Sequence, residues 1–213
     1  MPNRDLHDQR RDYEGPALLR EDLHADPIYQ FSEWMEEAEL SGILDPTAMT
    51  LATADTLGRP HARIVLLKQF GPEGFVFYTH GLSDKGRELA LNPHAALLFY
   101  WDRLDRQVRI EGRVETLPRE TVCAYFHQRP RDSQLSALIS DQSQPVASRE
   151  ALENRLAAAD AAYPDDVPCP RDWQSYRVIP ERFEFWQGRP NRLHDRFVYQ
   201  RKGGHWQIER LAP

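Results

Sequence analysis

The chain has 213 residues, of which 40% are hydrophobic and 28% charged, and its formal net charge is −6. This composition suits a globular protein with one sizeable core, while the acidic balance argues against a nucleic-acid partner or an anionic membrane surface. Two cysteines in a chain of this size predict free thiols in a reducing compartment. The polar N-terminus predicts no signal peptide, and no stretch is long enough to span a membrane, so a cytoplasmic protein is expected.

The first third predicts an arm, one helix and several hairpin strands. Residues 1–20 are strongly charged with little periodicity, which predicts a mobile N-terminal arm. Asp26 and Pro27 supply an N-cap and a first helical residue for a helix over 28–41. Short connections rich in Gly, Pro and Asp then predict antiparallel strands over 48–54, 61–70 and 75–79.

The remainder alternates between helices and strands. Ser83 predicts the N-cap of a helix over 84–91. The further helices are expected over 118–128, 133–140 and 148–162, and the further strands over 95–101, 107–117, 176–179, 182–187, 196–201 and 205–210. This pattern predicts an α+β fold, mainly antiparallel β, with one barrel domain over 21–213 and peripheral helices.

The run 63–68, Arg-Ile-Val-Leu-Leu-Lys, is the most informative strand. Four apolar residues between two cations, bounded by turn-formers, predict a strand buried on both faces. Arg63 and Lys68 are five residues apart, so a regular strand would point them to opposite faces. The two cations are also explained as the solvated ends of a core strand.

The familiar catalytic motifs are absent. No Gly-rich dinucleotide or phosphate loop, no nucleophile elbow and no Cys-x-x-Cys pair occurs, and the eight histidines show no metal-ligand spacing. Metal-dependent or triad hydrolysis therefore has little support, and no metal is expected. Binding of phosphates and aromatic rings remains.

Residues 125–133 form one candidate site between two predicted helices. Tyr125 and Arg129 are four apart and share a helix face, and Ser133 is expected to cap the next helix. A helix N-terminus with a hydroxyl and a guanidinium can hold a phosphate. An arginine that complements the helix dipole beside an ordinary N-cap explains the same residues and is the commoner arrangement.

Residues 183–197 form a second candidate. An aromatic strand end leads into Arg192-x-His194-x-Arg196, whose alternation would project two guanidiniums and an imidazole from one strand face. A bound anion or an electron-rich ring would relieve their repulsion. A salt-bridged hairpin edge, with Asp195 and Glu184 as partners, is an equally good explanation.

Taken together, several long motifs resemble the pyridoxine (pyridoxamine) 5′-phosphate oxidase family. The matching stretches are 63–68, Phe-Tyr-Thr at 77–79, Arg-Gln-Val at 106–108, Tyr-Phe-His-x-Arg-Pro-Arg-Asp-Ser-Gln at 125–134, Glu-Phe-Trp-Gln-Gly at 184–188, Arg-Leu-His-Asp-Arg-Phe at 192–197 and Arg-Leu-Ala-Pro at 210–213. The resemblance runs in order from about Arg10 to the end. It implies an FMN-binding split β-barrel that works as a homodimer with flavin at the subunit interface.

The resemblance also implies roles for individual residues. The FMN phosphate would be held by Arg63, Lys85 and Ser143, with the strand residues Ile64, Val65, Leu66, Leu67 and Lys68 beside the cofactor. The rest of FMN would be fixed by Tyr78, Thr79, Gln107, Gln142, Trp186 and Arg196. The substrate phosphate would be taken by Lys68, Tyr125, Arg129 and Ser133. The catalytic residues Arg192 and His194 would lie over the pyridine ring, with Arg10 and Tyr13 closing the site.

The implied reaction oxidises C4′ of pyridoxine or pyridoxamine 5′-phosphate to pyridoxal 5′-phosphate, with O₂ reoxidising FMN and giving H₂O₂. Two alternatives remain: a related split-barrel flavoenzyme that oxidises another aromatic acid, as in phenazine biosynthesis, and a non-catalytic flavin or pyridoxal-phosphate carrier. One departure stands out. Where the family usually has Ser-Arg-Lys, this chain has Ser83-Asp84-Lys85, and an aspartate beside a phosphate is repulsive unless it turns away or Arg87 compensates.

Overall fold

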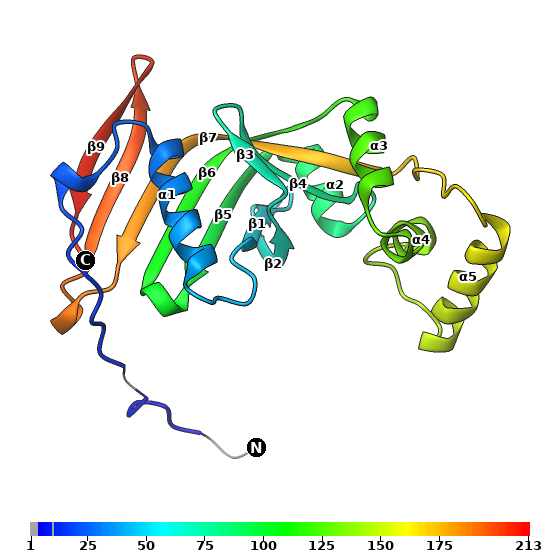
Figure 1. Ribbon diagram of the computed structural model, residues 1–213, viewed down its shortest axis with the longest axis horizontal. Helices are drawn as coiled ribbons and strands as arrows, with labels where there is room; N and C mark the ends of the chain where they lie inside the picture. Colours follow the sequence, from blue (N-terminus) through cyan, green and yellow to red (C-terminus); the bar gives the residue numbers. More distant parts are fainter. Residues whose placement is uncertain (1–3, 10) are drawn as a thin grey trace. The chain divides into compact units, whose positions relative to one another are not determined.

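The computed structural model describes residues 4–9 and 11–213 (Figure 1). Its helices are η1 (Arg20–Asp22), α1 (Pro27–Leu40), α2 (Asp84–Leu91), η2 (Asp102–Leu104), α3 (Arg119–Gln128), α4 (Arg131–Ile139), α5 (Arg149–Ala162) and η3 (Pro190–Arg192). Its strands are β1 (Ala48–Ala54), β2 (Pro60–Leu66), β3 (Gln69–Gly71), β4 (Gly74–His80), β5 (His94–Trp101), β6 (Arg106–Thr116), β7 (Trp173–Gln187), β8 (Asp195–Lys202) and β9 (His205–Leu211).

The strands form one sheet with the order β2-β1-β5-β6-β7-β4-β3, and β8 joins β7 to β9. The pairings of β1 with β2, of β4 with β3 and β7, and of β8 with β7 and β9 are antiparallel. The antiparallel α+β class predicted from the sequence is therefore confirmed. No helix among the described residues is long and apolar enough to cross a membrane.

Contacts divide the chain into two compact units. The first contains residues 1–47, 97–110 and 181–213, and the second contains 48–96 and 111–180. The long strand β7 contributes to both, because residues 173–178 pair with β4 whereas residues 182–187 pair with β8. The expected division into an arm over 1–20 and one domain over 21–213 stays a prediction.

The core of the first unit is aromatic. Asp26 caps α1 through the N–H of Ile28, and the helix places Phe31 and Trp34 inward. Phe31 packs edge-on against Phe99 of β5, with ring centroids 5.1 Å apart, and Trp34 packs against Phe185 of β7 at 5.2 Å. Burying such large rings supplies much of the stabilisation of a small core.

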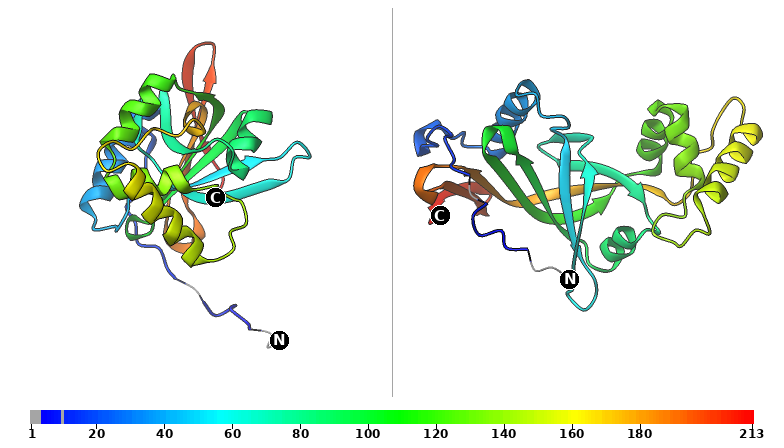
Figure 2. Two further views of the ribbon diagram at one scale, coloured as in Figure 1. Left: turned by 90° about the vertical axis from the view of Figure 1, so that its right-hand side faces the viewer. Right: turned by 90° about the horizontal axis from the view of Figure 1, so that it is seen from below.

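The second unit carries the helices α2 to α5 (Figures 1 and 2). Ser83 caps α2 by accepting from the N–H of Gly86, as the sequence predicts. A buried cluster, made of Val122, Phe126, Leu135, Ala159, Val167 and Trp173, joins α3, α4, α5 and the start of β7. This cluster fixes the end of α3 against the sheet of its own unit.

The strand expected over 61–70 is two strands. Pairing with β1 ends at Leu66, after which the N–H of Lys68 donates to the carbonyl of Val76 in β4. The expected burial on both faces is wrong: β2 lies at one end of the strand order, and the Ile64 side chain is 65% exposed. An apolar run of residues does not distinguish a strand buried in the core of its own chain from an apolar edge strand that another chain can bury.

Two further expectations differ. The strands expected at 176–179 and 182–187 are one strand, because Pro180 lies between the β4 and β8 pairings, where its missing N–H breaks no bond to either. The alternation expected for Arg192, His194 and Arg196 does not hold. Arg192 ends η3 with a φ of 63°, and β8 begins only at Asp195.

Candidate functional site

The second unit contains a cavity of about 660 Å³ that gathers much of the predicted site. Its lining includes four cationic side chains, Arg63, Lys68, Lys85 and Arg129, and no carboxylate among the described residues. The other lining residues are Ile64, Val65, Leu66, Tyr78, Thr79, His80, Tyr125, Ser136, Ala137, Ser140, Gln142 and Trp173. In a chain of net charge −6, this concentration of cations favours anions, and the volume of the cavity suits a small molecule.

Arg63 and Lys68 line this same cavity, although a regular strand would turn them apart. The chain leaves β2 after Leu66, and this departure removes the two-residue alternation before Lys68. The opposite-face expectation is therefore wrong. Both cations can act on molecules in one cavity.

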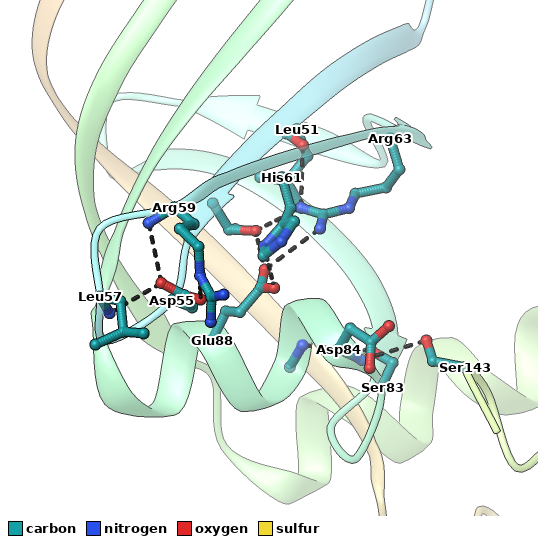
Figure 3. A network of polar contacts seen from close by, with 12 residues as sticks. Leu51, Asp55, Leu57, Arg59, His61, Arg63, Ser83, Asp84, Glu88 and Ser143 are labelled. Carbon is teal, nitrogen blue, oxygen red and sulfur yellow. Dashed lines mark hydrogen bonds and ion pairs between the residues drawn. The ribbon is translucent and has the colours of Figure 1, made fainter.

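Arg63 is held by groups of its own unit. Its guanidinium donates to the carbonyl of Leu51 (3.2 Å) and to the Thr53 hydroxyl, and its Nη2 pairs with Oε2 of Glu88 at 3.3 Å. Figure 3 shows Arg63 and His61 of β2 converging on Glu88 of α2. These contacts fix the direction of the guanidinium before any ligand binds.

Lys85 reaches the cavity from the first turn of α2. Its Nζ donates to the side-chain oxygen of Gln142 (2.9 Å) and to the Thr79 hydroxyl (3.2 Å). Burial, and then the nearby Arg63 cation, lower the pKa of Lys85. A bound anion between the two cations would compensate their repulsion and so favour the charged form of Lys85.

Arg129 follows the last turn of α3 and is the least satisfied group of the cavity. Its buried Nη1 has no hydrogen-bond partner among the described residues, and burial lowers its pKa. Leaving a buried cationic donor unpaired is costly, so such a group is normally matched by a ligand or an ion. The orphan nitrogen marks a place for an anion.

Asp84 does not line this cavity. It lines a neighbouring cavity of about 440 Å³ together with Arg87, His61 and Glu88. Its backbone N–H donates to the Ser143 hydroxyl at 3.2 Å, which ties the 142–143 loop to α2. The carboxylate that departs from the family pattern therefore lines a cavity that contains Arg87 and also Arg63, which the two cavities share.

A second group of predicted residues lies in the first unit. The ring of His194 is 4.7 Å from that of Trp186 and 5.2 Å from that of Tyr13, measured between centroids. The N–H of Arg189 donates to Nδ1 of His194 (3.1 Å), so Nδ1 carries no proton. Burial, and then the Arg192 cation, lower the pKa of His194. The imidazole is therefore neutral at pH 7, with Nε2–H as a donor.

The remaining predicted residues are placed as follows. Leu67 is buried in the core, Gln107 is half-buried on β6, and Ser143 has a left-handed backbone with a φ of 72°. Ser133 does not cap α4: Pro130 is the N-cap, and Ser133 lies within the first turn. Arg192 is exposed, and Arg10 lies outside the described residues.

Arg196 is engaged by a carboxylate. Its Nη2 lies 2.7 Å from Oε1 of Glu184, a carboxylate only 2% exposed that also pairs with Arg182 at 3.1 Å. The ion-paired alternative for this hairpin is therefore present, although Glu184 is buried rather than solvated. The role of Arg196 as a flavin ligand stays a prediction.

We expect the Glu184 cluster to make stability acid-sensitive. Burial raises the pKa of Glu184, but hydrogen bonds from Arg196 and Arg182 outweigh this and lower it below the usual 4.5. Its stabilisation is thus fully present above pH 4.5 and is lost as pH falls through the folded-state pKa. Thermal unfolding measured against pH should show this loss.

In Glu184→Gln, the acid-dependent part of the unfolding curve should shrink, and stability at neutral pH should fall by about 3–5 kcal/mol. The control is Glu153→Gln, which removes the exposed pair of Arg149 and Glu153 and should cost no more than ~1 kcal/mol. Equal losses for the two variants would contradict the assignment.

Two residues of the cavity's surroundings escaped the sequence analysis. Trp173 lines the cavity, and Glu88, which is 9% exposed, anchors Arg63. The sequence gives no local signal that Trp173 belongs to a site. It directly follows the 163–172 link, which joins α5 to β7. Glu88 is one turn after Asp84 on α2, and its spacing alone suggests an ordinary helix carboxylate.

Comparison with known families and relatives gives a consistent result. Residues 35–161 match the family model "Pyridoxamine 5'-phosphate oxidase", and residues 173–213 match "Pyridoxine 5'-phosphate oxidase C-terminal dimerisation region". A Hydrogenovibrio crunogenus protein called pyridoxine/pyridoxamine 5′-phosphate oxidase 1 is 56% identical, with 100% of each chain covered. A Thermosynechococcus vestitus protein called pyridoxine/pyridoxamine 5′-phosphate oxidase is 52% identical, with 98% of this chain and 99% of that one covered.

Solved structures confirm the predicted fold. PhzG from Burkholderia lata, solved in complex with tetrahydrophenazine-1-carboxylic acid, matches with a TM-score of 0.88 and 30% identity, over 93% of this chain and 99% of that one. An FMN-binding protein from Nostoc punctiforme, related to pyridoxamine 5′-phosphate oxidase, matches with a TM-score of 0.72 and 17% identity, over 90% and 100%. The fold is the split barrel of these proteins.

Proposed function

The chain belongs to the pyridoxamine 5′-phosphate oxidase family, and from this premise we propose that it oxidises pyridoxine 5′-phosphate or pyridoxamine 5′-phosphate at C4′ with FMN as cofactor. The product is pyridoxal 5′-phosphate, with water consumed and ammonia released when the amine is the substrate, and O₂ is the electron acceptor. When bound, FMN would supply the redox chemistry that links oxidation of the substrate to reduction of O₂ to H₂O₂. The protein supplies binding, orientation and electrostatics.

One observation carries the proposal: four cations and no carboxylate line a single cavity of the described chain. Both FMN and the substrate are phosphate esters, so two dianionic groups must be matched. Arg63 and Lys85 form one cationic pair, and burial followed by repulsion from Arg63 lowers the pKa of Lys85. Lys68 and Arg129 supply the other two positive charges, and Nη1 of Arg129 has no acceptor among the described residues. These residues fit the two phosphates.

We assign the first pair to the FMN phosphate. Arg63 is preorganised by Leu51, Thr53 and Glu88, and Lys85 is linked to Gln142 and Thr79, which are themselves hydrogen-bonded at 2.8 Å. Such a network holds its donors in place before the ligand arrives, so little ordering cost is paid on binding.

We assign Lys68, Tyr125 and Arg129 to the substrate phosphate. Their function is positional, because a fixed phosphate holds C4′ at reacting distance. Arg192, a permanent cation, favours negative charge that develops on the pyridine ring. Neutral His194 donates from Nε2 to a polar substituent of the substrate, since its Nδ1 is already an acceptor.

Arg192→Ala should lower kcat while FMN remains bound. The substitution removes an exposed cation that is not one of the four cations assigned to the two phosphates. Steady-state peroxide production and the flavin absorbance of the same sample measure the two effects. Unchanged turnover would remove the role of Arg192, and loss of flavin would move it to cofactor binding.

The direct test is peroxide formation by the FMN-loaded protein on adding pyridoxine 5′-phosphate, compared with unphosphorylated pyridoxine. The PhzG complex favours a second candidate, oxidation of a phenazine-type carboxylic acid, which the same assay can include. Preference for the phosphorylated substrate supports the proposal, whereas preference for the aromatic acid supports the alternative. A yellow protein that forms no peroxide with any of them would be a carrier.

We further propose that the active form is a homodimer. The match of residues 173–213 to a dimerisation region supports this proposal. A second support is the side chain of Ile64, which lies on the edge strand β2 and is 65% exposed. A second copy would cover apolar surface that this chain leaves in water. Sedimentation analysis of the purified protein checks the expected mass. A cytoplasmic location stays a prediction.

A further inference from the structure

Three aromatic rings form a cluster at the wall of the cavity. The centroid of the Tyr78 ring of β4 lies 4.1 Å from that of Tyr125 of α3 and 5.1 Å from that of Trp173 of β7, and the Tyr125 and Trp173 centroids are 6.1 Å apart. The Tyr125 and Trp173 rings are tilted by only 7° to each other. All three residues line the cavity, and they come from three different elements of the second unit.

The guanidinium of Arg129 lies over the Trp173 ring of this cluster. Its central carbon lies 4.8 Å from the Trp173 ring centroid, and the next ring, Phe126, is 5.9 Å away. Its Nη1 has no hydrogen-bond partner among the described residues. A partly desolvated cation over an indole face is held by the ring quadrupole, and tryptophan is the strongest such partner. The indole therefore fixes where Arg129 points.

Trp173 is itself rigidly placed. It is 6% exposed and belongs to the buried cluster that joins α3, α4 and α5. The backbone N–H of Trp173 donates to the carbonyl of Pro170 (3.1 Å), and the backbone carbonyl of Trp173 accepts from Nη1 of Arg119 (2.8 Å). Because Arg119 begins α3 and Arg129 follows its end, the helix is attached to the start of β7 at both ends.

We infer that Trp173 is a positioning residue that sets the substrate-phosphate subsite by holding the Arg129 guanidinium and the Tyr125 ring. This inference rests on the proposed function for the identity of the ligand. It adds a residue outside the family motifs found in the sequence. It also makes selectivity for phosphorylated over unphosphorylated ring compounds depend on an indole that bears no charge.

The test compares Trp173→Leu with Trp173→Phe. The first removes the aromatic face, and the second keeps a smaller one. Trp173→Leu should raise KM for pyridoxine 5′-phosphate about tenfold, the change that ~1.4 kcal/mol produces, with a smaller effect on kcat. Trp173→Phe should recover part of this loss, since phenylalanine still offers a ring face to a cation.

The matched control is Trp206→Leu. Trp206 also makes a cation–π contact, with the central guanidinium carbon of Arg201 at 5.4 Å from its ring centroid, but Trp206 does not line the cavity. This variant should leave KM unchanged. A second readout, calorimetric binding of pyridoxal 5′-phosphate and of pyridoxal, measures selectivity without turnover. Trp173→Leu should weaken only the phosphorylated ligand, and circular dichroism checks that each variant is folded.

The outcomes separate this inference from the proposed function. Normal turnover of the wild type with an unchanged KM in both Trp173 variants would overturn the inference and leave the function standing. Selective loss of pyridoxal 5′-phosphate binding in an inactive protein would support the inference and overturn the function. Equal weakening of pyridoxal and its phosphate would show that Trp173 acts only on the fold. If Trp173→Leu does not fold, Trp173→Phe decides by the same criteria.

Discussion

Arg129→Ala should raise KM for pyridoxine 5′-phosphate by about 10- to 100-fold. A hydrogen bond to a charged group contributes about 1.5–3 kcal/mol, and every ~1.4 kcal/mol is a factor of ten. The side chain is half-buried, and its buried Nη1 has no hydrogen-bond partner among the described residues, so a phosphate contact at this nitrogen replaces no existing bond within the protein. Weak turnover of unphosphorylated pyridoxine should change little, because that molecule makes no such contact.

The control for this variant is Arg131→Ala. Arg131 is only two residues further along, but its guanidinium pairs with Asp160 at 2.6 Å and does not line the cavity. Its loss should leave KM for the phosphorylated substrate unchanged. Similar effects of the two substitutions, or an unchanged KM in Arg129→Ala, would remove Arg129 from the substrate site. Arg129→Lys should restore KM for the phosphorylated substrate only in part, since the ammonium group of lysine is a point charge and lacks the planar fork of donors of arginine.

Arg63→Ala should weaken FMN binding by about 100-fold, while riboflavin, which has no phosphate, should bind as before. The substitution removes a preorganised phosphate donor, and a charge-assisted pair of bonds is worth about 1.5–3 kcal/mol. It also leaves the buried Glu88 carboxylate without its Arg63 partner. The negative charge of Glu88 then opposes binding of the phosphate. Quenching of flavin fluorescence measures both affinities.

Lys85→Met separates the two contributions to this loss. It removes a cation from the cavity but leaves the pair of Arg63 and Glu88 intact, so FMN affinity should fall by a smaller factor. The matched control is Arg59→Ala, on the same hairpin, which breaks the exposed pair with Asp55. Parallel loss of riboflavin and FMN in Arg63→Ala would mean that the variant damages the fold rather than the phosphate site.

Local chemistry made much of the fold predictable. The bounds of β1 and α2 agree with the sequence prediction, and the caps at Asp26 and Ser83 form the expected hydrogen bonds. These features depend on neighbours within a few residues, so one stretch of sequence contains all the information required. The turn-rich connections likewise indicated antiparallel pairing.

Long-range placement was harder to predict. The exposure of β2 depends on what lies beyond its edge, and the shared cavity of Arg63 and Lys68 depends on a switch of pairing from β1 to β4. Neither is visible in an apolar run. Trp173 meets Arg129 only because the 163–172 link brings the start of β7 to the end of α3.

The candidate site shows the same division. The motifs identified Arg63, Lys85, Tyr125 and Arg129, and the structure places all four at one cavity. Arg196 was assigned to the flavin by resemblance, whereas its guanidinium is bonded to Glu184 and to the carbonyl of Ala212. A motif therefore identifies a residue more securely than it identifies the contact that the residue makes.

The central claim is that one cation-lined cavity holds two phosphates side by side. A crystal structure of the protein with FMN and pyridoxal 5′-phosphate tests this most directly. We expect one phosphate against Arg63 and Lys85 and the other against Arg129 and Lys68. A structure in which either phosphate lies away from these four side chains would contradict the account.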